Sequence, residues 1–185
     1  CRGVSLGGNV LAKYFGEQGR AALPKAAVAV STSFDLSAAA QALEHGISRL
    51  LYTHYFLRTL LAKVPPTTQK FRTLGEFDDA CTAPLNGFAG KEEYYVRASA
   101  KPLLKSIAVP TLLNAKNDPF VPAASLPTPR DVSASVGLYR PEHGGHVGFV
   151  GGKGRGNVRW LPETVIRFFE KTVFQAETLF SKCTE

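Results

Sequence analysis

The stretch Gly3-Val4-Ser5-Leu6-Gly7 lies at the start of the chain and decides how the rest of the sequence is interpreted. A G-x-S-x-G pentapeptide is typical of a sharp turn from a strand into a helix, which raises a serine hydroxyl above a sheet. The two glycines suit this turn because a Cβ at either position would crowd the neighbouring strand and helix. The pattern therefore predicts a strand before Ser5, a helix after it, and Ser5 as a nucleophile.

The residues that follow the pentapeptide have the spacing of an amphipathic helix. We expect a helix over residues 8–19, closed by the glycines at its end. The positive end of its dipole then points at Ser5, where negative charge develops during acyl transfer. The expected buried face of this helix consists of Val10, Leu11, Tyr14 and Phe15.

Two later segments supply candidate partners for Ser5. Residues 109–115 form a short apolar run that predicts a buried parallel strand, and Asp118 follows it. Residues 136–140 predict a final strand, followed by a glycine-flanked loop that carries His146. Open α/β sheets place their sites at the carboxyl ends of strands. The chain order Ser, Asp, His is that of α/β-hydrolases and differs from the orders in chymotrypsin and subtilisin, so we expect a catalytic triad.

Two other kinds of site do not fit the glycine-rich region around His146. A phosphate-binding loop fails around Gly152-Lys153, because Val147 replaces the first glycine of that motif and Gly154 replaces its Ser or Thr. His143 and His146 are close in sequence, but no H-E-x-x-H pattern or Cys/His cluster accompanies them. We therefore expect no metal and no cofactor, and a structural role for His143.

Composition and charge favour one soluble globular unit. Hydrophobic residues make up 44% of the chain, and no apolar run approaches the roughly 20 residues of a membrane span. The net charge is +7, with a mild basic cluster at residues 153–159, but no basic helix or nucleic-acid motif accompanies it, so we expect no nucleic-acid partner. Cys1, Cys81 and Cys183 are widely spaced and odd in number, which favours a reducing cytoplasm over a disulfide framework.

The remaining segments add one strand and several helices. Residues 26–32 predict a strand directly after the first helix, which gives the β-α-β order of a parallel sheet. Asp35 is the expected N-cap of a helix that runs to Leu43, and residues 46–63 predict another helix. The segment that continues to residue 106 is helical in character, and its aromatic residues (Phe77, Tyr94, Tyr95) favour core over substrate pocket.

A last helix is predicted after Trp160-Leu161, with Pro162 in its first turn. Its apolar residues recur at helical spacing, so we expect one face of the helix to be buried. The expected buried residues are Val165, Ile166, Phe168, Phe169 and Val173.

Several motifs together resemble one family of hydrolases. They are S-L-G-G-N at residues 5–9, F-D-D at 77–79 with T-A-P-L-N-G-F at 82–88, N-D-P-F at 117–120 and H-G-G-H-V-G-F at 143–149. On the basis of these motifs, the chain resembles the YheT-like α/β-hydrolases over nearly its whole length. That family is related to the animal ABHD1/ABHD3-type hydrolases. The resemblance implies Ser5 as nucleophile, Asp118 as acid and His146 as base, acting on carboxylic esters or lipid-like acyl esters.

The resemblance also implies a fold. We expect residues 1–185 to be the C-terminal part of an α/β-hydrolase domain, a mostly parallel sheet flanked by helices, with a helical cap over about residues 44–106. The first strands, and the loop after strand three that supplies a second oxyanion donor, would precede Cys1. A sheet without those strands would leave the edge beside strand 26–30 unpaired. The T-A-P-L-N-G-F segment would lie in the cap, and its chemistry alone assigns it no role.

The expected chemistry is acyl transfer through an acyl-enzyme. His146 takes the proton from Ser5 as the hydroxyl attacks an acyl carbonyl, while Asp118 holds the imidazole tautomer. The backbone N–H of Leu6 donates one hydrogen bond to the oxyanion, and water then releases the acyl group. The same triad would also serve an acyltransferase, and a chain that lacks half its sheet could be catalytically inactive. Both alternatives stay open, as do membrane association and oligomeric state.

Overall fold

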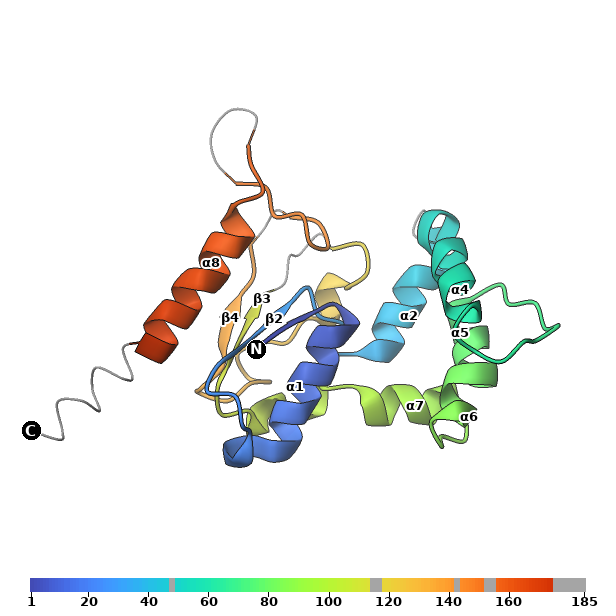
Figure 1. Ribbon diagram of the computed structural model, residues 1–185, viewed down its shortest axis with the longest axis horizontal. Helices are drawn as coiled ribbons and strands as arrows, with labels where there is room; N and C mark the ends of the chain where they lie inside the picture. Colours follow the sequence, from blue (N-terminus) through green and yellow to red (C-terminus); the bar gives the residue numbers. More distant parts are fainter. Residues whose placement is uncertain (47–48, 114–117, 142–143, 152–155, 175–185) are drawn as a thin grey trace, which may run out of the picture.

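The short apolar runs of the sequence pair into one parallel sheet in the computed structural model (Figure 1). The structure describes residues 1–46, 49–113, 118–141, 144–151 and 156–174. Within them the sheet has four strands in the order β1-β2-β3-β4, and every neighbouring pair is parallel. The strands are β1 (Arg2–Val4), β2 (Ala27–Val30), β3 (Pro110–Leu113) and β4 (Gly137–Tyr139).

Helices fill the connections between these strands. The link from β1 to β2 holds α1 (Leu6–Gln18) and a short 3-10 helix, η1 (Gly19–Ala21). The link from β2 to β3 holds α2 (Leu36–Glu44), η2 (Arg49–Thr53), α4 (His54–Leu61), α5 (Leu74–Phe77), η3 (Asp78–Thr82), α6 (Ala83–Leu85), α7 (Lys91–Ala98) and η4 (Lys101–Ser106). A short turn, η5 (Ala123–Ser125), precedes β4, and α8 (Trp160–Phe169) with η6 (Glu170–Phe174) follows it.

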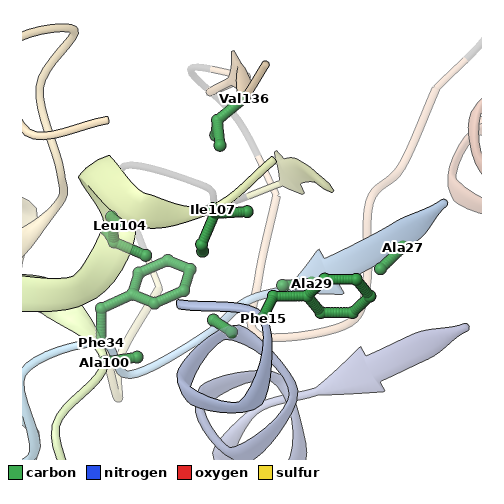
Figure 2. Close-up of a cluster of buried hydrophobic side chains, with 9 residues drawn as sticks. Phe15, Ala27, Ala29, Phe34, Ala100, Leu104, Ile107 and Val136 are labelled. Carbon is green, nitrogen blue, oxygen red and sulfur yellow. The ribbon is translucent and has the colours of Figure 1, made fainter. Parts of the chain in front are cut away.

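One face of the sheet is covered by α1 and the segment around η4. Ala27 and Ala29 of β2 point to this face, where Figure 2 shows Phe15 of α1 next to them. Phe34 lies in the same cluster beside Leu104 of η4. The side chains of this cluster are almost fully buried, so it forms the larger core of the described residues.

The other face of β2 packs against α8. Val28 and Val30 alternate with the two alanines of the strand and contact Phe149 and Val165, and Trp160 packs at the margin of this second cluster. A parallel sheet of this kind needs cover on both faces, because its strands are apolar on both sides. In Figure 1, α8 lies on one side of the sheet, and α2 and α4–α7 lie on the opposite side of the molecule, beyond α1.

The predicted helix after the pentapeptide is present, but its expected buried face is partly wrong. Val10 is 62% exposed, whereas Phe15 is fully buried. Small residues take the packed face, because a Cβ at Gly16 would lie 2.5 Å from the Cβ of Leu103, so only a glycine lets α1 approach η4 this closely. The last helix shows a similar difference, since Ile166 is exposed while Val165 is buried. In each helix one expected residue is exposed, and the other expected residues whose side chains are described pack against the core.

The expectation that strand 26–30 has an unpaired edge is wrong. Strand β2 pairs on one side with β3 and on the other with β1, where Arg2 aligns with Val28 and Val4 with Val30. The amide of Val28 also donates to the carbonyl of Cys1 at 2.9 Å. Residues 2–4 thus form the strand that the pentapeptide predicts.

The expected N-cap of α2 agrees with the structure. The side chain of Asp35 accepts a hydrogen bond from the backbone N–H of Ala38, as an N-cap residue does. Cys1 and Cys81 are free thiols, and Cys183 lies outside the described residues. In the described part of the chain, no helix combines the length and the apolar character needed to cross a membrane.

Asn9 ties α1 to the segment before η4. Its Nδ2 donates to the carbonyl of Ala98 and its Oδ1 accepts from the amide of Ala100, both at 2.8 Å, and the residue is 2% exposed. The buried amide side chain of Asn9 therefore provides the hydrogen-bond partner for two backbone groups, the carbonyl of Ala98 and the N–H of Ala100. Asn86 offers a matched comparison, since its Nδ2 donates to a backbone carbonyl at an exposed position.

We predict that Asn9→Ala lowers the free energy of unfolding by about 2 kcal/mol or more, because two backbone groups lose their partner in a buried place. Asn86→Ala should cost about 1 kcal/mol or less, since water replaces the lost bond. Urea unfolding of the protein that carries this chain measures both. Equal losses in the two variants would contradict the role given to Asn9.

Candidate active site

Ser5 is the single residue that joins β1 to α1. Its backbone has φ 54° and ψ −126°, a left-handed conformation that costs a non-glycine residue about 1–3 kcal/mol. The neighbouring strand holds it there, because the N–H of Ser5 donates to the carbonyl of Val30 at 2.9 Å. The chain thus reverses from strand to helix within one residue, and the side chain of Ser5 is left half-buried at the end of the sheet.

Glycines make this sharp turn possible, although not both of the glycines that the motif suggests. A Cβ at Gly3 would lie 2.5 Å from the carbonyl oxygen of Gly7, and one at Gly8 would lie 1.9 Å from Oγ1 of Thr32. A Cβ at Gly7 would meet nothing within 4 Å, so the expectation of crowding at this position is wrong. The close approach of helix to sheet falls one residue later, at Gly8.

Asp118 and His146 are in direct contact. Nδ1 of His146 lies 2.9 Å from Oδ2 and 3.1 Å from Oδ1 of Asp118. The side chain of Asp118 has no exposed surface, whereas that of His146 keeps 17%. The amide of Phe120 also donates to Oδ1 of Asp118 at 2.9 Å, which fixes the carboxyl group from a second direction.

This contact sets the chemical state of the imidazole. A carboxylate accepts hydrogen bonds, so Nδ1 carries the proton of the ring. The other nitrogen, Nε2, is then left with a lone pair that can accept a proton. His146 has the arrangement of a base that is oriented by an acid.

Phe120 packs against the histidine ring. The centroids of the Phe120 and His146 rings are 4.4 Å apart and the rings are nearly perpendicular, at 85°. Phe120 in turn contacts Tyr52 of η2 edge-on at 4.7 Å, and Phe56 of α4 at 6.0 Å. The helices between β2 and β3 therefore reach the imidazole through a chain of aromatic rings.

Ser5 and His146 line the same cavity, of about 420 Å³. A volume of this size lies within the range of small-molecule sites, roughly 300–1,000 Å³. Leu6, Ser33 and Phe120 contribute to the wall near the sheet. Lys63, which follows α4, also lines the cavity. The other lining residues come from α2, α4, α5, η3 and α7, and they are Leu36, Ala39, Ala40, Leu43, Phe56, Thr59, Leu60, Leu74, Asp78, Thr82, Tyr94 and Tyr95.

The remaining site expectations have different outcomes. Leu6 is the first residue of α1, so its N–H has no acceptor within the helix, and the residue lines the cavity. Phe77 is buried away from the cavity, Tyr95 is buried and also lines the cavity, and Tyr94 lines the cavity without being fully buried, so the preference for a core role holds in part. His143, Asn117 and the basic residues 153–155 lie outside the described residues. Among the residues that the structure describes, no three His, Cys, Asp or Glu side chains gather as metal ligands would.

Two residues of the cavity had no role in the sequence interpretation. Phe120 follows Asp118 closely within the N-D-P-F motif, and Asp78 belongs to the F-D-D motif. Both motifs were visible in the sequence, but nothing in their residue types indicates a contact with a histidine ring or with a cavity. Burial raises the pKa of Asp78, and this rise is opposed chiefly by hydrogen bonds from Thr82 and Tyr95.

Comparison with curated proteins gives several relatives, although no family model matches the chain. YheT of Escherichia coli, which carries the name of an esterase, is 39% identical over 178 residues, covering 88% of this chain and 52% of YheT. Human phospholipase ABHD3 is 30% identical over 164 residues, 81% of this chain and 40% of that protein. Monoacylglycerol lipase of Saccharomyces cerevisiae is 31% identical over 190 residues, 91% of this chain and 41% of the lipase. The chain spans about half the length of these relatives, or less.

The turn at Ser5 gives a matched pair of substitutions. We predict that Gly3→Ala lowers the free energy of unfolding by about 1–3 kcal/mol or more, because the added methyl meets backbone atoms that cannot move aside. Gly7→Ala lies in open space in the first turn of α1 and should be neutral or stabilising by up to about 1 kcal/mol. Chemical denaturation measures both, and a destabilisation by Gly7→Ala equal to that by Gly3→Ala would rule out this packing.

Proposed function

We propose that this chain, which is related to the YheT-like α/β-hydrolases over most of its length, carries the catalytic triad of a serine hydrolase that cleaves carboxylic esters. One observation supports this most strongly. Ser5 and His146 line one cavity, and Nδ1 of His146 is held by the buried carboxyl of Asp118. This arrangement supports the assignment of Ser5 as nucleophile, His146 as base and Asp118 as orienting acid in acyl transfer.

The proposed reaction begins at the hydroxyl of Ser5. Nε2 of His146 takes the hydroxyl proton as the oxygen attacks the acyl carbonyl, and the imidazolium that forms is stabilised by Asp118. The proton then passes to the leaving alcohol, and the acyl group remains on Ser5. Water repeats the sequence, with His146 as base, and releases the acid.

The developing oxyanion needs donors that are already in place. We assign the N–H of Leu6 to this task, because it begins α1 and the positive end of the helix dipole lies at the same point. We place the second donor in the part of the fold that the relatives have beyond the matched region. A site with a single donor would stabilise the oxyanion far less, since removal of one donor typically costs about 10²–10³ in kcat.

The helices of about residues 44–106 are the proposed cap over the site. They and α2 supply most of the cavity wall, and their contribution is largely aliphatic and aromatic. An apolar wall beside the nucleophile suits the hydrocarbon part of an acyl ester. The relatives are named as an esterase, a phospholipase and a monoacylglycerol lipase, which is consistent with ester substrates of a lipid-like kind.

We predict that Ser5→Ala abolishes labelling by a fluorophosphonate probe in the protein that carries this chain, because the probe needs an activated serine. Ser33→Ala is the matched control, since Ser33 lines the same cavity. Gel fluorescence after labelling measures both variants. Persistent labelling of Ser5→Ala would reject Ser5 as the nucleophile, and no labelling of the unaltered protein would favour an inactive chain.

Asp118→Asn should lower kcat for ester hydrolysis on the order of 10³–10⁴-fold with little change in KM, because the amide no longer holds the reactive tautomer of His146. Steady-state kinetics on a p-nitrophenyl ester measures this. An effect below about tenfold would contradict the role of Asp118 as the orienting acid. Analysis of products in the presence of a competing alcohol separates a hydrolase from an acyltransferase, since only the latter gives mainly the new ester.

A further inference from the structure

Asp78 introduces a carboxyl group into the helical wall of the cavity that holds Ser5 and His146. It begins η3, and Thr82 at the other end of η3 and Tyr95 of α7 line the same cavity. Asp78 is half-buried and Tyr95 is 8% exposed. We call these three residues the Asp78 cluster. They are polar, they line the same wall of the cavity, and the carboxylate of Asp78 lies between the other two.

The hydrogens of the cluster are already used within it. Oγ1 of Thr82 donates to Oδ1 of Asp78 at 2.6 Å, and the hydroxyl of Tyr95 donates to Oδ2 at 2.8 Å. Each hydroxyl has one hydrogen to donate, and a carboxylate has none. With both hydroxyl hydrogens donated to the carboxylate, the cluster has only acceptor lone pairs left to offer, and its complement is a group that donates a hydrogen bond.

The surroundings of this carboxyl disfavour its charged form. Burial is the largest cause and raises the pKa of Asp78, the hydrogen bonds from Thr82 and Tyr95 lower it, and the smaller charge effects of Glu44 and Lys91 raise and lower it respectively. Burial and the charge of Asp78 also raise the pKa of Tyr95, so its hydroxyl stays protonated as a donor. A half-buried carboxylate gains from an additional donor, since hydrogen bonds to charged groups are the stronger ones.

We propose that the Asp78 cluster is a specificity site that accepts a hydrogen bond from a free hydroxyl group of the ester substrate, carried on its alcohol part or its acyl part. The inference rests on the proposed function, because the same cavity must hold the reacting ester. A hydroxyl fits better than an ammonium group, since the surrounding wall is largely apolar and a cation would lose more hydration there.

The neighbouring carboxyl shows what a purely structural role looks like. Oδ1 of Asp79 accepts from the backbone N–H of Lys91 at 2.8 Å, and Asp79 is exposed. It stabilises the start of α7 and takes no part in the cavity wall. Asp79→Asn is therefore the matched control for Asp78→Asn, with the same chemical change one residue away.

The test begins with the unaltered protein and two comparisons among esters of eight-carbon acids. The first compares 2-hydroxyethyl octanoate with propyl octanoate and 2-methoxyethyl octanoate, and the second compares ethyl 8-hydroxyoctanoate with ethyl octanoate. We expect kcat/KM to favour the free hydroxyl by about tenfold or more in at least one comparison, as for a hydrogen bond to a charged group. Absence of this preference in both comparisons would overturn the proposal.

Asp78→Asn should lose most of that preference, and Asp79→Asn should keep it. The asparagine keeps the shape of the carboxyl and an acceptor for Thr82, and thermal melting checks that the variant is folded. An equal loss in the two variants would overturn the proposal. So would a preference for choline octanoate that depends on Asp78, because that ester carries a cation without a hydrogen to donate. If Asp78→Asn does not fold, the substrate comparisons with the unaltered protein decide alone.

Binding of uncleavable ligands separates this inference from the proposed reaction. If the protein cleaves no ester, the proposed function fails, and calorimetry with 2-(hexyloxy)ethanol and its methyl ether still tests the cluster. Binding of the free alcohol about tenfold tighter than the methyl ether, lost in Asp78→Asn, would support it. Equal affinities would overturn it.

Discussion

The turn at Ser5 constrains the rest of the structure. One residue in a left-handed conformation joins β1 to α1, and its N–H is fixed to the carbonyl of Val30 on the next strand. Gly3 and Gly8 permit this because a Cβ at either would overlap its neighbours. The start of α1, the side chain of Ser5 and the end of the sheet are therefore held in one place, and the cavity forms beside them.

The parallel sheet brings the other candidate residues to that place. Val4, Val30, Leu113 and Tyr139 align across the four strands, so all strands end at one edge. Asp118 and His146 follow the third and fourth strands and meet beyond this edge, while the long link from β2 to β3 adds the helical wall. Phe120 joins the two regions, because it contacts the ring of His146 and the aromatic residues of η2 and α4.

Local patterns predicted the elements well and their packing less well. The strands, the N-cap at Asp35 and the helix after Ser5 follow from residues near each other in sequence. The exposure of Val10 does not, because Gly16 and Leu103 decide which face of α1 packs, and Leu103 lies far along the chain. For the same reason the place of Asp78 in the cavity does not follow from the sequence, since Asp78, Tyr95 and Ser5 come to line one cavity only in the folded chain. The catalytic roles of Ser5, Asp118 and His146 stay predictions.

The most direct test of the proposed chemistry is to trap the acyl-enzyme. The protein that carries this chain is mixed with a p-nitrophenyl octanoate ester, quenched in acid within the first turnover and digested with trypsin. Cleavage after Arg2 and Lys13 releases residues 3–13, a peptide in which Ser5 is the sole serine. Mass spectrometry should find the octanoyl group on this peptide. Release of p-nitrophenol by the protein with the acyl group on another peptide, or with no acyl-enzyme at all, would contradict the account.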